Sequence, residues 1–151
     1  GCDLLNLHCA GGFEMMQRAK EAVGEHSKLI GVTQLTSTNQ KILNEELGIA
    51  GTVEASVLNY AQLAKRAGLA GVVCSPLEVR ALKQACGQNF LAVTPGVRPR
   101  DVETQDQKRI MTPAEALDAG SDYLVIGRPI VANSDPNGAF LRILEEIEVE
   151  A

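Results

Sequence analysis

Positive charge is scarce in this sequence. Its 151 residues include 14 Lys and Arg against 19 Asp and Glu, for a formal net charge of −5. Proteins that bind nucleic acid or anionic membrane surfaces need an excess of basic residues to meet phosphate groups. We therefore expect neither kind of partner, and any site for an anion must be a local one.

Long apolar runs are also lacking. No stretch approaches the roughly 20 apolar residues that a spanning helix needs, and the first residues lack the basic segment and apolar stretch that direct export. These absences predict a cytoplasmic protein with no membrane partner. Apolar residues nevertheless make up 45% of the chain and charged residues 22%, as in soluble globular proteins. The length predicts a single domain over residues 1–151.

Cysteines are few and form no Cys-x-x-Cys motif of the kind that zinc sites and redox disulfides use. We expect Cys2, Cys9, Cys74 and Cys86 to be reduced and mostly buried. A metal at Cys2, His8 and Cys9 is disfavoured, because adjacent strand residues such as His8 and Cys9 point to opposite faces. The favoured interpretation is a hydrogen-bonded histidine at a strand end and no metal.

What the sequence does contain is a repeated unit. Five short apolar runs recur, and each ends in polar residues or glycine. Continuous apolar runs are typical of parallel strands that are buried on both faces. The runs are CDLLNLHC (residues 2–9), KLIGVTQL (28–35), AGVVCS (70–75), FLAVTPG (90–96) and DYLVIGR (122–128).

Helical patterns separate most of these runs. Thr52, Thr112 and Asp135 stand where helix N-caps are expected. Gly68 and Gly120 stand where helices commonly end. The alternation of strand and helix predicts an α/β fold with a parallel sheet. The predicted helices are residues 14–23, 52–68, 112–120 and 135–147.

Two architectures fit this alternation, an open doubly wound sheet and a (β/α)₈ barrel. No strand is followed by the glycine-rich nucleotide motifs of open sheets, and the lone Gly11 and Gly12 pair is more typical of a helix-entry turn. Barrels commonly hold a phosphate in the loops after their last two strands. Here those strands end in TPGVRPR and IGRPI, which favours the barrel.

Gly127 and Arg128 suit a phosphate. A glycine lets an oxygen approach the backbone N–H because no Cβ blocks the way. An arginine adds a fork of donors matched to phosphate geometry. Gly96 and Arg98 repeat the pair after the preceding strand. The alternative is two solvated arginines beside tight turns, and we favour it less because both pairs end the final strands of one sheet.

These segments, in this order, resemble the C-terminal part of bacterial orotidine 5′-phosphate decarboxylase over nearly the whole chain. The resemblance implies a (β/α)₈ (TIM) barrel, of which this chain holds roughly strands 4 to 8. It also implies a homodimeric carboxy-lyase that converts orotidine monophosphate (OMP) to uridine monophosphate (UMP) and CO₂ in pyrimidine biosynthesis, without metal or organic cofactor. The segments are NLHCAGG, VTQLTST, GLAGVVCS, FLAVTPGVRP and DQKRIMTPAEALDAGSDYLVIGRPI.

The resemblance assigns substrate-binding roles to five residues. Arg128 and the Gly127 backbone would bind the 5′-phosphate, and Arg98 would border the same pocket. Thr36 would contact the pyrimidine, and Gln107 would lie on a loop that closes over the ligand. Without the resemblance, a helix cap for Thr36 and a solvated amide for Gln107 would be preferred. The polar loop 99–109 is long for a strand-to-helix connection, which suits a closing lid.

The family's catalytic Lys and Asp array is missing. Its core, Asp-x-Lys-x-x-Asp, strains the substrate carboxylate and supplies a proton, and this sequence has no Lys-x-x-Asp. The segment GCDLLNLH matches the family's fourth strand, so the resemblance implies that the preceding strands are absent and that this chain alone is inactive. The first and last runs would then be open sheet edges, with inward-facing side chains left uncovered at Leu5, Val73, Val93 and Val125.

Three interpretations remain open. The first is the C-terminal portion of an OMP decarboxylase. The second is a sugar-phosphate decarboxylase or lyase of the same suprafamily, such as 3-keto-gulonate 6-phosphate decarboxylase. That enzyme would need a magnesium site, and TQLTST and DQKRIMTP speak against it. The third is a non-catalytic, phosphate-binding half-barrel that self-associates.

Overall fold

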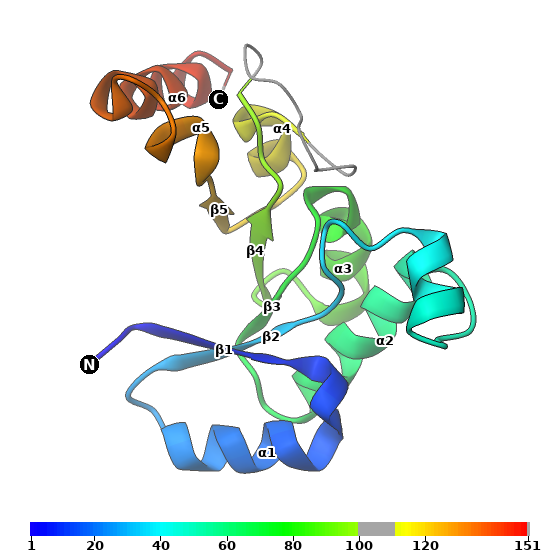
Figure 1. Ribbon diagram of the computed structural model, residues 1–151. Coiled ribbons are helices and arrows are strands. Elements are labelled where there is room, and N and C mark those ends of the chain that lie inside the picture. Colours follow the sequence, from blue (N-terminus) through cyan, green and yellow to red (C-terminus); the bar gives the residue numbers. More distant parts are fainter. Residues whose placement is uncertain (100–110, 151) are drawn as a thin grey trace.

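The computed structural model describes residues 1–99 and 111–150, and these contain one parallel five-stranded sheet (Figure 1). Its order is β1-β2-β3-β4-β5, so each strand pairs with the next one along the chain. A barrel has this order, whereas the order of a doubly wound sheet reverses at a switch point. The predicted parallel α/β sheet is confirmed. The strands are β1 (Leu4–His8), β2 (Lys28–Val32), β3 (Gly71–Val73), β4 (Leu91–Pro95) and β5 (Tyr123–Val125).

Helices begin at the predicted caps. Thr52 Oγ1 accepts a hydrogen bond from the backbone of Ala55, and Thr112 forms a capping box with Glu115. Asp135 Oδ1 accepts from the N–H of Gly138, 3.0 Å away. The helices are α1 (Gly12–Val23), α2 (Val53–Arg66), α3 (Val79–Cys86), α4 (Pro113–Asp118), α5 (Arg128–Val131) and α6 (Pro136–Glu150), with short turns of helix at η1 (Cys9–Gly11), η2 (Ile42–Glu46) and η3 (Pro76–Glu78).

Helix α3 is missing from the sequence prediction, although its start is encoded in SPLE. The Ser75 hydroxyl accepts a hydrogen bond from the N–H of Leu77, and Glu78 Oε2 accepts from the N–H of Ser75 at 2.8 Å. This reciprocal pair satisfies backbone donors at a helix start. Val79 and Leu82, three residues apart, then point into the core and are fully buried.

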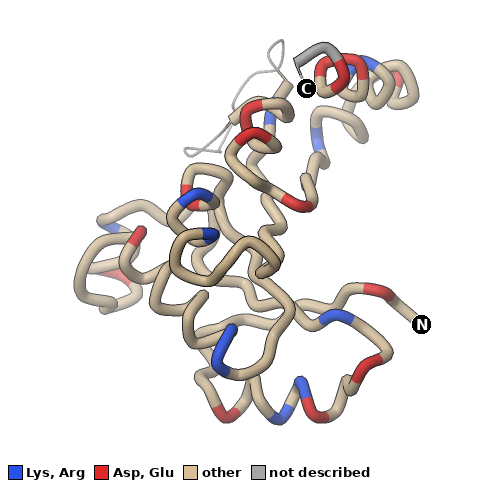
Figure 2. The backbone as a smooth tube through the Cα atoms, turned by 180° about the vertical axis from the view of Figure 1, so that it is seen from behind, with Lys and Arg blue, Asp and Glu red and all other residues tan. Residues whose placement is uncertain are grey.

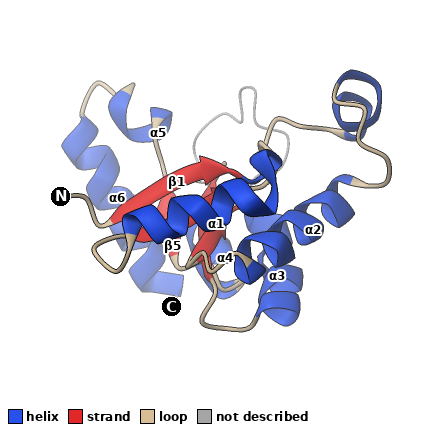
Figure 3. Ribbon diagram, turned by 90° about the horizontal axis from the view of Figure 1, so that it is seen from below, coloured by secondary structure: helices blue, strands red, loops and turns tan. Residues whose placement is uncertain are grey.

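The helices cover one face of the sheet. The register places Gly31, Val72 and Ala92 in one row across β2, β3 and β4, and all three are buried. Helices α1 to α4 curve round this side (Figure 1), and α2 and α3 lie side by side (Figure 3). The core therefore lies between sheet and helices; it includes Met16 of α1, Val57, Ala61 and Ala64 of α2, and Leu82 of α3.

The opposite face is open at its β5 side. One row across this face consists of Val32, Val73, Val93 and Tyr123. Tyr123 is 48% exposed, and Val125, two residues further along β5, is equally exposed. The apolar strand pattern predicts burial on both faces, but the described residues leave Tyr123 and Val125 half exposed on the face opposite the helices.

The expected inward position of Leu5 is wrong. The register pairs Leu5 with Leu29, which is 4% exposed and belongs to the core between sheet and helices. Paired residues of parallel strands point to the same side, so Leu5 lies on the helix-covered face. Val73 and Val93 occupy the open face as expected.

Lys and Arg are spread over several elements of the described chain, and no one element gathers them (Figure 2). Acidic residues are most closely spaced in the second half of α6, at Glu145, Glu146, Glu148 and Glu150. Among the described helices, none has both the length and the apolar character that crossing a membrane requires.

Among the described strands, β1 and β5 are the two outer ones. Outer strands present unpaired N–H and C=O groups, which favour pairing with another chain. We expect the isolated 151-residue chain to self-associate or to remain partly molten. Self-association that covers Tyr123 and Val125 is favoured further, because full burial of an apolar side chain stabilises the buried state by roughly 1.5 to 3 kcal/mol.

Size-exclusion chromatography with light scattering measures the mass of this chain, and the near-UV circular dichroism of Tyr60 and Tyr123 reports on side-chain packing. A monomer that unfolds cooperatively at micromolar concentration would contradict the expectation.

Candidate functional site

All five strands are parallel, so their carboxyl ends meet at one edge of the sheet. In barrel enzymes this edge carries the active site, built from the loops that follow the strands. The residues that directly follow the strands are Cys9, Thr33, Cys74, Gly96 and Ile126.

Both glycine–arginine turns, residues 96–98 after β4 and residues 127–128 after β5, lie at this edge. Pro95 and Val125 form the last register pair of β4 and β5. Arg98 and Arg128 each stand three positions beyond that pair. The neighbouring strands β4 and β5 thus deliver both arginines to the same end of the sheet.

Arg98 is a buried residue, only 7% exposed. Its Nη1 donates to the carbonyl of Val97 at 2.8 Å, and its backbone N–H donates to the carbonyl of Met111 at 2.9 Å. The preceding Gly96 has a φ of +81°, a conformation that favours glycine. Arg98 is therefore held in place by its turn, and the alternative of a solvated surface arginine does not apply to it.

Arg128, by contrast, is exposed at the start of α5. Gly127 precedes it, and the Gly127 carbonyl accepts hydrogen bonds from the N–H groups of Ile130 and Val131 at 2.9 and 3.0 Å. A Cβ at Gly127 would meet nothing within 4 Å, and the φ there is −101°. Packing against described residues therefore does not call for glycine at this position, and the exposed Gly127 backbone is open to a ligand.

Thr36 lies in the turn after β2 and is 8% exposed. The turn is closed by a hydrogen bond of 2.9 Å from the N–H of Thr38 to the carbonyl of Leu35. The helix-cap alternative for Thr36 is wrong, because the cap of η2 is Lys41 and the cap of α2 is Thr52.

The sequence reading missed the buried polar residues that precede Thr36. Gln34 Nε2 donates to Ser56 Oγ on α2 at 3.0 Å, and both residues are buried. Thr33 Oγ1 donates to the carbonyl of Val73 at 2.9 Å, which ties the end of β2 to β3. The available signal was TQLTST itself, a polar string directly after a buried strand.

Gln107 and most of the loop 99–109 lie outside the described residues.

Cys9 and His8 do not combine into a reactive pair or a metal site. Cys9 is fully buried in the core, whereas His8 is exposed. Burial raises the pKa of the Cys9 thiol to about 11, so it is protonated at neutral pH and is a poor nucleophile. Among the described residues, no group of three or more His, Cys, Asp and Glu side chains is placed to hold a metal ion.

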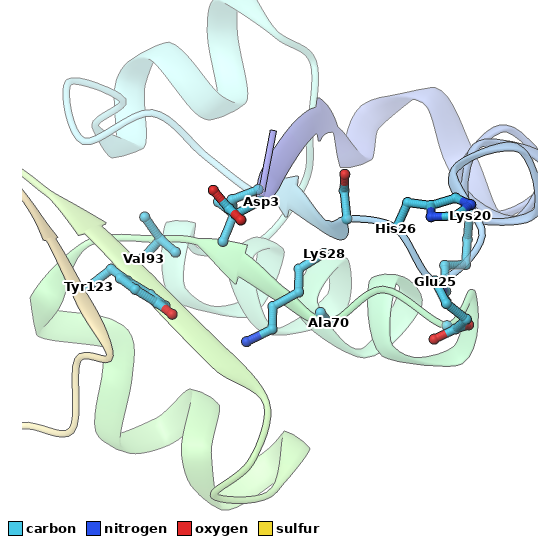
Figure 4. Close-up of a pocket in the computed structure, with 11 residues that line it drawn as sticks. Asp3, Lys20, Glu25, His26, Lys28, Ala70, Val93 and Tyr123 are labelled. Carbon is cyan, nitrogen blue, oxygen red and sulfur yellow. The ribbon is translucent and has the colours of Figure 1, made fainter. Parts of the chain in front are cut away.

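A cavity of about 810 Å³ lies away from this edge, near the amino ends of the strands. Asp3, Lys28 and Ala70 line it from the starts of β1, β2 and β3. The side chains of Lys28 and Tyr123 extend into the same space (Figure 4). Because active sites of barrels lie at the carboxyl ends of the strands, we place the candidate site at the glycine–arginine turns and not in this cavity.

The sequence matches known proteins along most of its length. The model of the family described as "Orotidine 5′-phosphate decarboxylase / HUMPS family" matches residues 1–143. An orotidine 5′-phosphate decarboxylase of Streptococcus gordonii is 50% identical over 146 residues. That alignment covers 97% of this chain and 64% of the relative, so the chain spans less than two thirds of the relative's length.

Solved structures of similar proteins share the fold of this chain. The orotidine 5′-phosphate decarboxylase of Lactobacillus acidophilus superimposes with a TM-score of 0.82 at 36% identity, over 97% of this chain and 64% of that one. An uncharacterized conserved protein of Geobacillus kaustophilus gives a TM-score of 0.79 at 40% identity, with the same coverage. The five strands are therefore an arc of a (β/α)₈ barrel, as the sequence predicts.

Gly96 and Gly127 are expected to differ in their tolerance of a side chain. Gly96→Ala should lower the free energy of unfolding by about 1 kcal/mol, because its positive φ strains an L residue. Gly127→Ala should leave it nearly unchanged, because a Cβ there has open space.

The experiment uses a chimera of full barrel length. Its first part is the N-terminal region of the Streptococcus gordonii relative, up to the residue that aligns with Gly1, and its second part is this chain. Urea unfolding measures the free energy of unfolding of both variants in this chimera. A larger loss for Gly127→Ala than for Gly96→Ala would show that Gly127 serves the fold.

Proposed function

Because the chain belongs to the orotidine 5′-phosphate decarboxylase / HUMPS family, we propose that it is the phosphate- and pyrimidine-binding part of an OMP decarboxylase. The observation that carries this proposal is the pair of glycine–arginine turns at the ends of β4 and β5. In a chain of net charge −5, such a local concentration of donors suits one phosphate group.

The family name also includes HUMPS, so the family match by itself leaves the sugar-phosphate alternative open. The relative at 50% identity is named as an OMP decarboxylase, which favours that activity here. The turn after β2 supports the same choice, since its threonines Thr33, Thr36 and Thr38 offer hydroxyl groups for the edge of a base. A self-associating, non-catalytic half-barrel is the remaining alternative.

In the proposed complex, the Arg128 guanidinium and the Gly127 N–H bind the 5′-phosphate. Arg128 is exposed to an incoming ligand, whereas Arg98 is held by its turn and borders the pocket with a fixed charge. The Thr36 hydroxyl contacts the pyrimidine, and the role that the resemblance implies for Gln107, outside the described residues, is contact with phosphate and base. Together these contacts orient the nucleotide across the carboxyl edge of the sheet.

The chemical step needs groups that this chain does not contain. In decarboxylation the bond between the ring carbon and the substrate carboxylate breaks, CO₂ leaves, and the carbon takes up a proton. The resemblance assigns the proton donor and the carboxylate that opposes the substrate to an Asp-x-Lys-x-x-Asp segment, and the sequence has no Lys-x-x-Asp. The contribution of this chain is binding energy and orientation.

We further propose that the enzyme is a cytoplasmic homodimer that uses no metal or organic cofactor, with OMP and UMP as its small-molecule partners and no nucleic acid or membrane partner. The acidic balance of the chain supports the last point.

The purified 151-residue chain should not decarboxylate OMP. Loss of the positioned proton donor and of the strained carboxylate contact removes the chemical step, so the rate should fall by many orders of magnitude. The assay is the loss of OMP absorbance, with the chimera as positive control. Turnover of OMP by the chain alone, after removal of contaminating host enzyme, would contradict the prediction that this chain is inactive.

Arg128→Ala in the chimera should weaken UMP binding by roughly 2 to 4 kcal/mol, because a charge-assisted contact to phosphate is lost. Uridine, which has no phosphate, should bind almost as before. Isothermal titration calorimetry measures both ligands. Arg18→Ala is the matched control, because Arg18 is an exposed arginine of α1 whose ion-pair partner is Glu21. Equal weakening for UMP and uridine would show that Arg128 supports the fold.

A further inference from the structure

A buried lysine lies near the amino ends of β4 and β5, opposite the proposed phosphate site. The Lys83 side chain, from the last turn of α3, is 7% exposed. Its Nζ donates to Asp122 Oδ2 at 2.7 Å, to the carbonyl of Gln88 at 2.9 Å and to the carbonyl of Phe90 at 3.0 Å. These three bonds match the three donors of an ammonium group, so Lys83 is fully engaged within the fold.

The partners of Lys83 belong to the segments that enter two neighbouring strands. Gln88 and Phe90 lead into β4, and Asp122 directly precedes β5. Asp122 Oδ2 also accepts from the N–H of Ala92 at 2.7 Å, and the Asp122 N–H donates to the Ala92 carbonyl at 2.9 Å. One ammonium and one carboxylate therefore fasten the start of β5 to the start of β4.

Strand β5 has little else in the described sheet to set its register. It has three residues, and it pairs with β4 alone. A slip of one residue would turn every side chain of a strand to the other face and move its end by about 3.3 Å. Thr94 Oγ1 of β4 adds contacts to the Tyr123 carbonyl at 3.2 Å and to Ser121 Oγ, just before β5, at 3.1 Å.

The register of these two strands also sets the relative position of the two glycine–arginine turns. Arg98 and Arg128 follow the last pair of β4 and β5 by the same number of residues, so a shift between the strands becomes a shift between the arginines. We propose that Lys83, acting through Asp122, is a positioning residue that holds the two turns in place for a nucleotide phosphate. This inference rests on the proposed function for the identity of the ligand.

Lys83→Met in the chimera removes the ammonium and keeps an apolar stem of similar length. We expect UMP to bind about tenfold more weakly, because small displacements of positioned groups have large effects, while uridine changes less than twofold. Amide hydrogen exchange in residues 121–128 should accelerate at the same time. Asp122→Asn, which keeps an acceptor for the Ala92 N–H, should give the same pattern with a smaller change.

Arg80→Ala is the matched control. Arg80 lies on the same helix α3 and pairs with Asp118 at 2.6 Å, but both of these side chains are exposed, whereas Lys83 is buried. Arg80→Ala removes one cation of α3 and its ion pair with Asp118 of α4, and it leaves the pair of Lys83 with Asp122 in place. UMP affinity and exchange in residues 121–128 should stay at the values of the parent chimera.

The two proposals fail in different ways. If Lys83→Met lowers stability but changes neither UMP affinity nor exchange in residues 121–128, Lys83 is only a structural residue and the inference is overturned. If Arg128→Ala affects UMP and uridine equally, the assigned phosphate site is wrong. Exchange in residues 121–128 then still decides whether Lys83 holds the turns: faster exchange supports that role, and unchanged exchange overturns it.

Discussion

Parallel pairing of the five strands in chain order is the constraint on which the rest of this structure depends. Because each strand pairs with the next one in sequence, the described helices between the strands gather on the same face of the sheet. The same constraint brings all carboxyl ends to one edge. Residues as distant in sequence as Thr36 and Arg128 thereby share one edge of the sheet.

The two ends of β4 and β5 have different physical demands. At their amino ends a buried ion pair, Lys83 with Asp122, is surrounded by backbone partners that satisfy its donors and acceptors. At their carboxyl ends lie the two arginines of the proposed ligand site, with Arg98 buried and Arg128 exposed. Rigidity at the amino ends is what allows two short turns at the carboxyl ends to keep a fixed separation.

The open face and the outer strands β1 and β5 show where the described sheet is incomplete as a barrel. Its helix-covered face is packed like an ordinary core, while Tyr123 and Val125 remain half exposed on the other face. The coverage of 64% in both the curated relative and the Lactobacillus acidophilus structure agrees with an arc and not a closed ring. A barrel core needs side chains from all its strands to fill its layers, and five strands supply only part of them.

The sequence by itself determined the local structure and the order of the elements. The caps at Thr52, Thr112 and Asp135 were readable because a hydroxyl or carboxylate beside a helix start bonds to N–H groups a few residues away. The glycine–arginine turns were readable because each is a contiguous motif. Helix α3 carried an equally local signal in its capping box, but the pattern was overlooked.

Only the tertiary structure decided which face each strand residue occupies and which distant groups meet. Leu5 was misplaced because a continuous apolar run has no alternation to distinguish its faces, and the register with Leu29 settles the matter. The pairing of Lys83 with Asp122 spans 39 residues, and that of Gln34 with Ser56 joins a loop to a helix. Such contacts depend on how whole helices and strands pack, so no local sequence pattern predicts them.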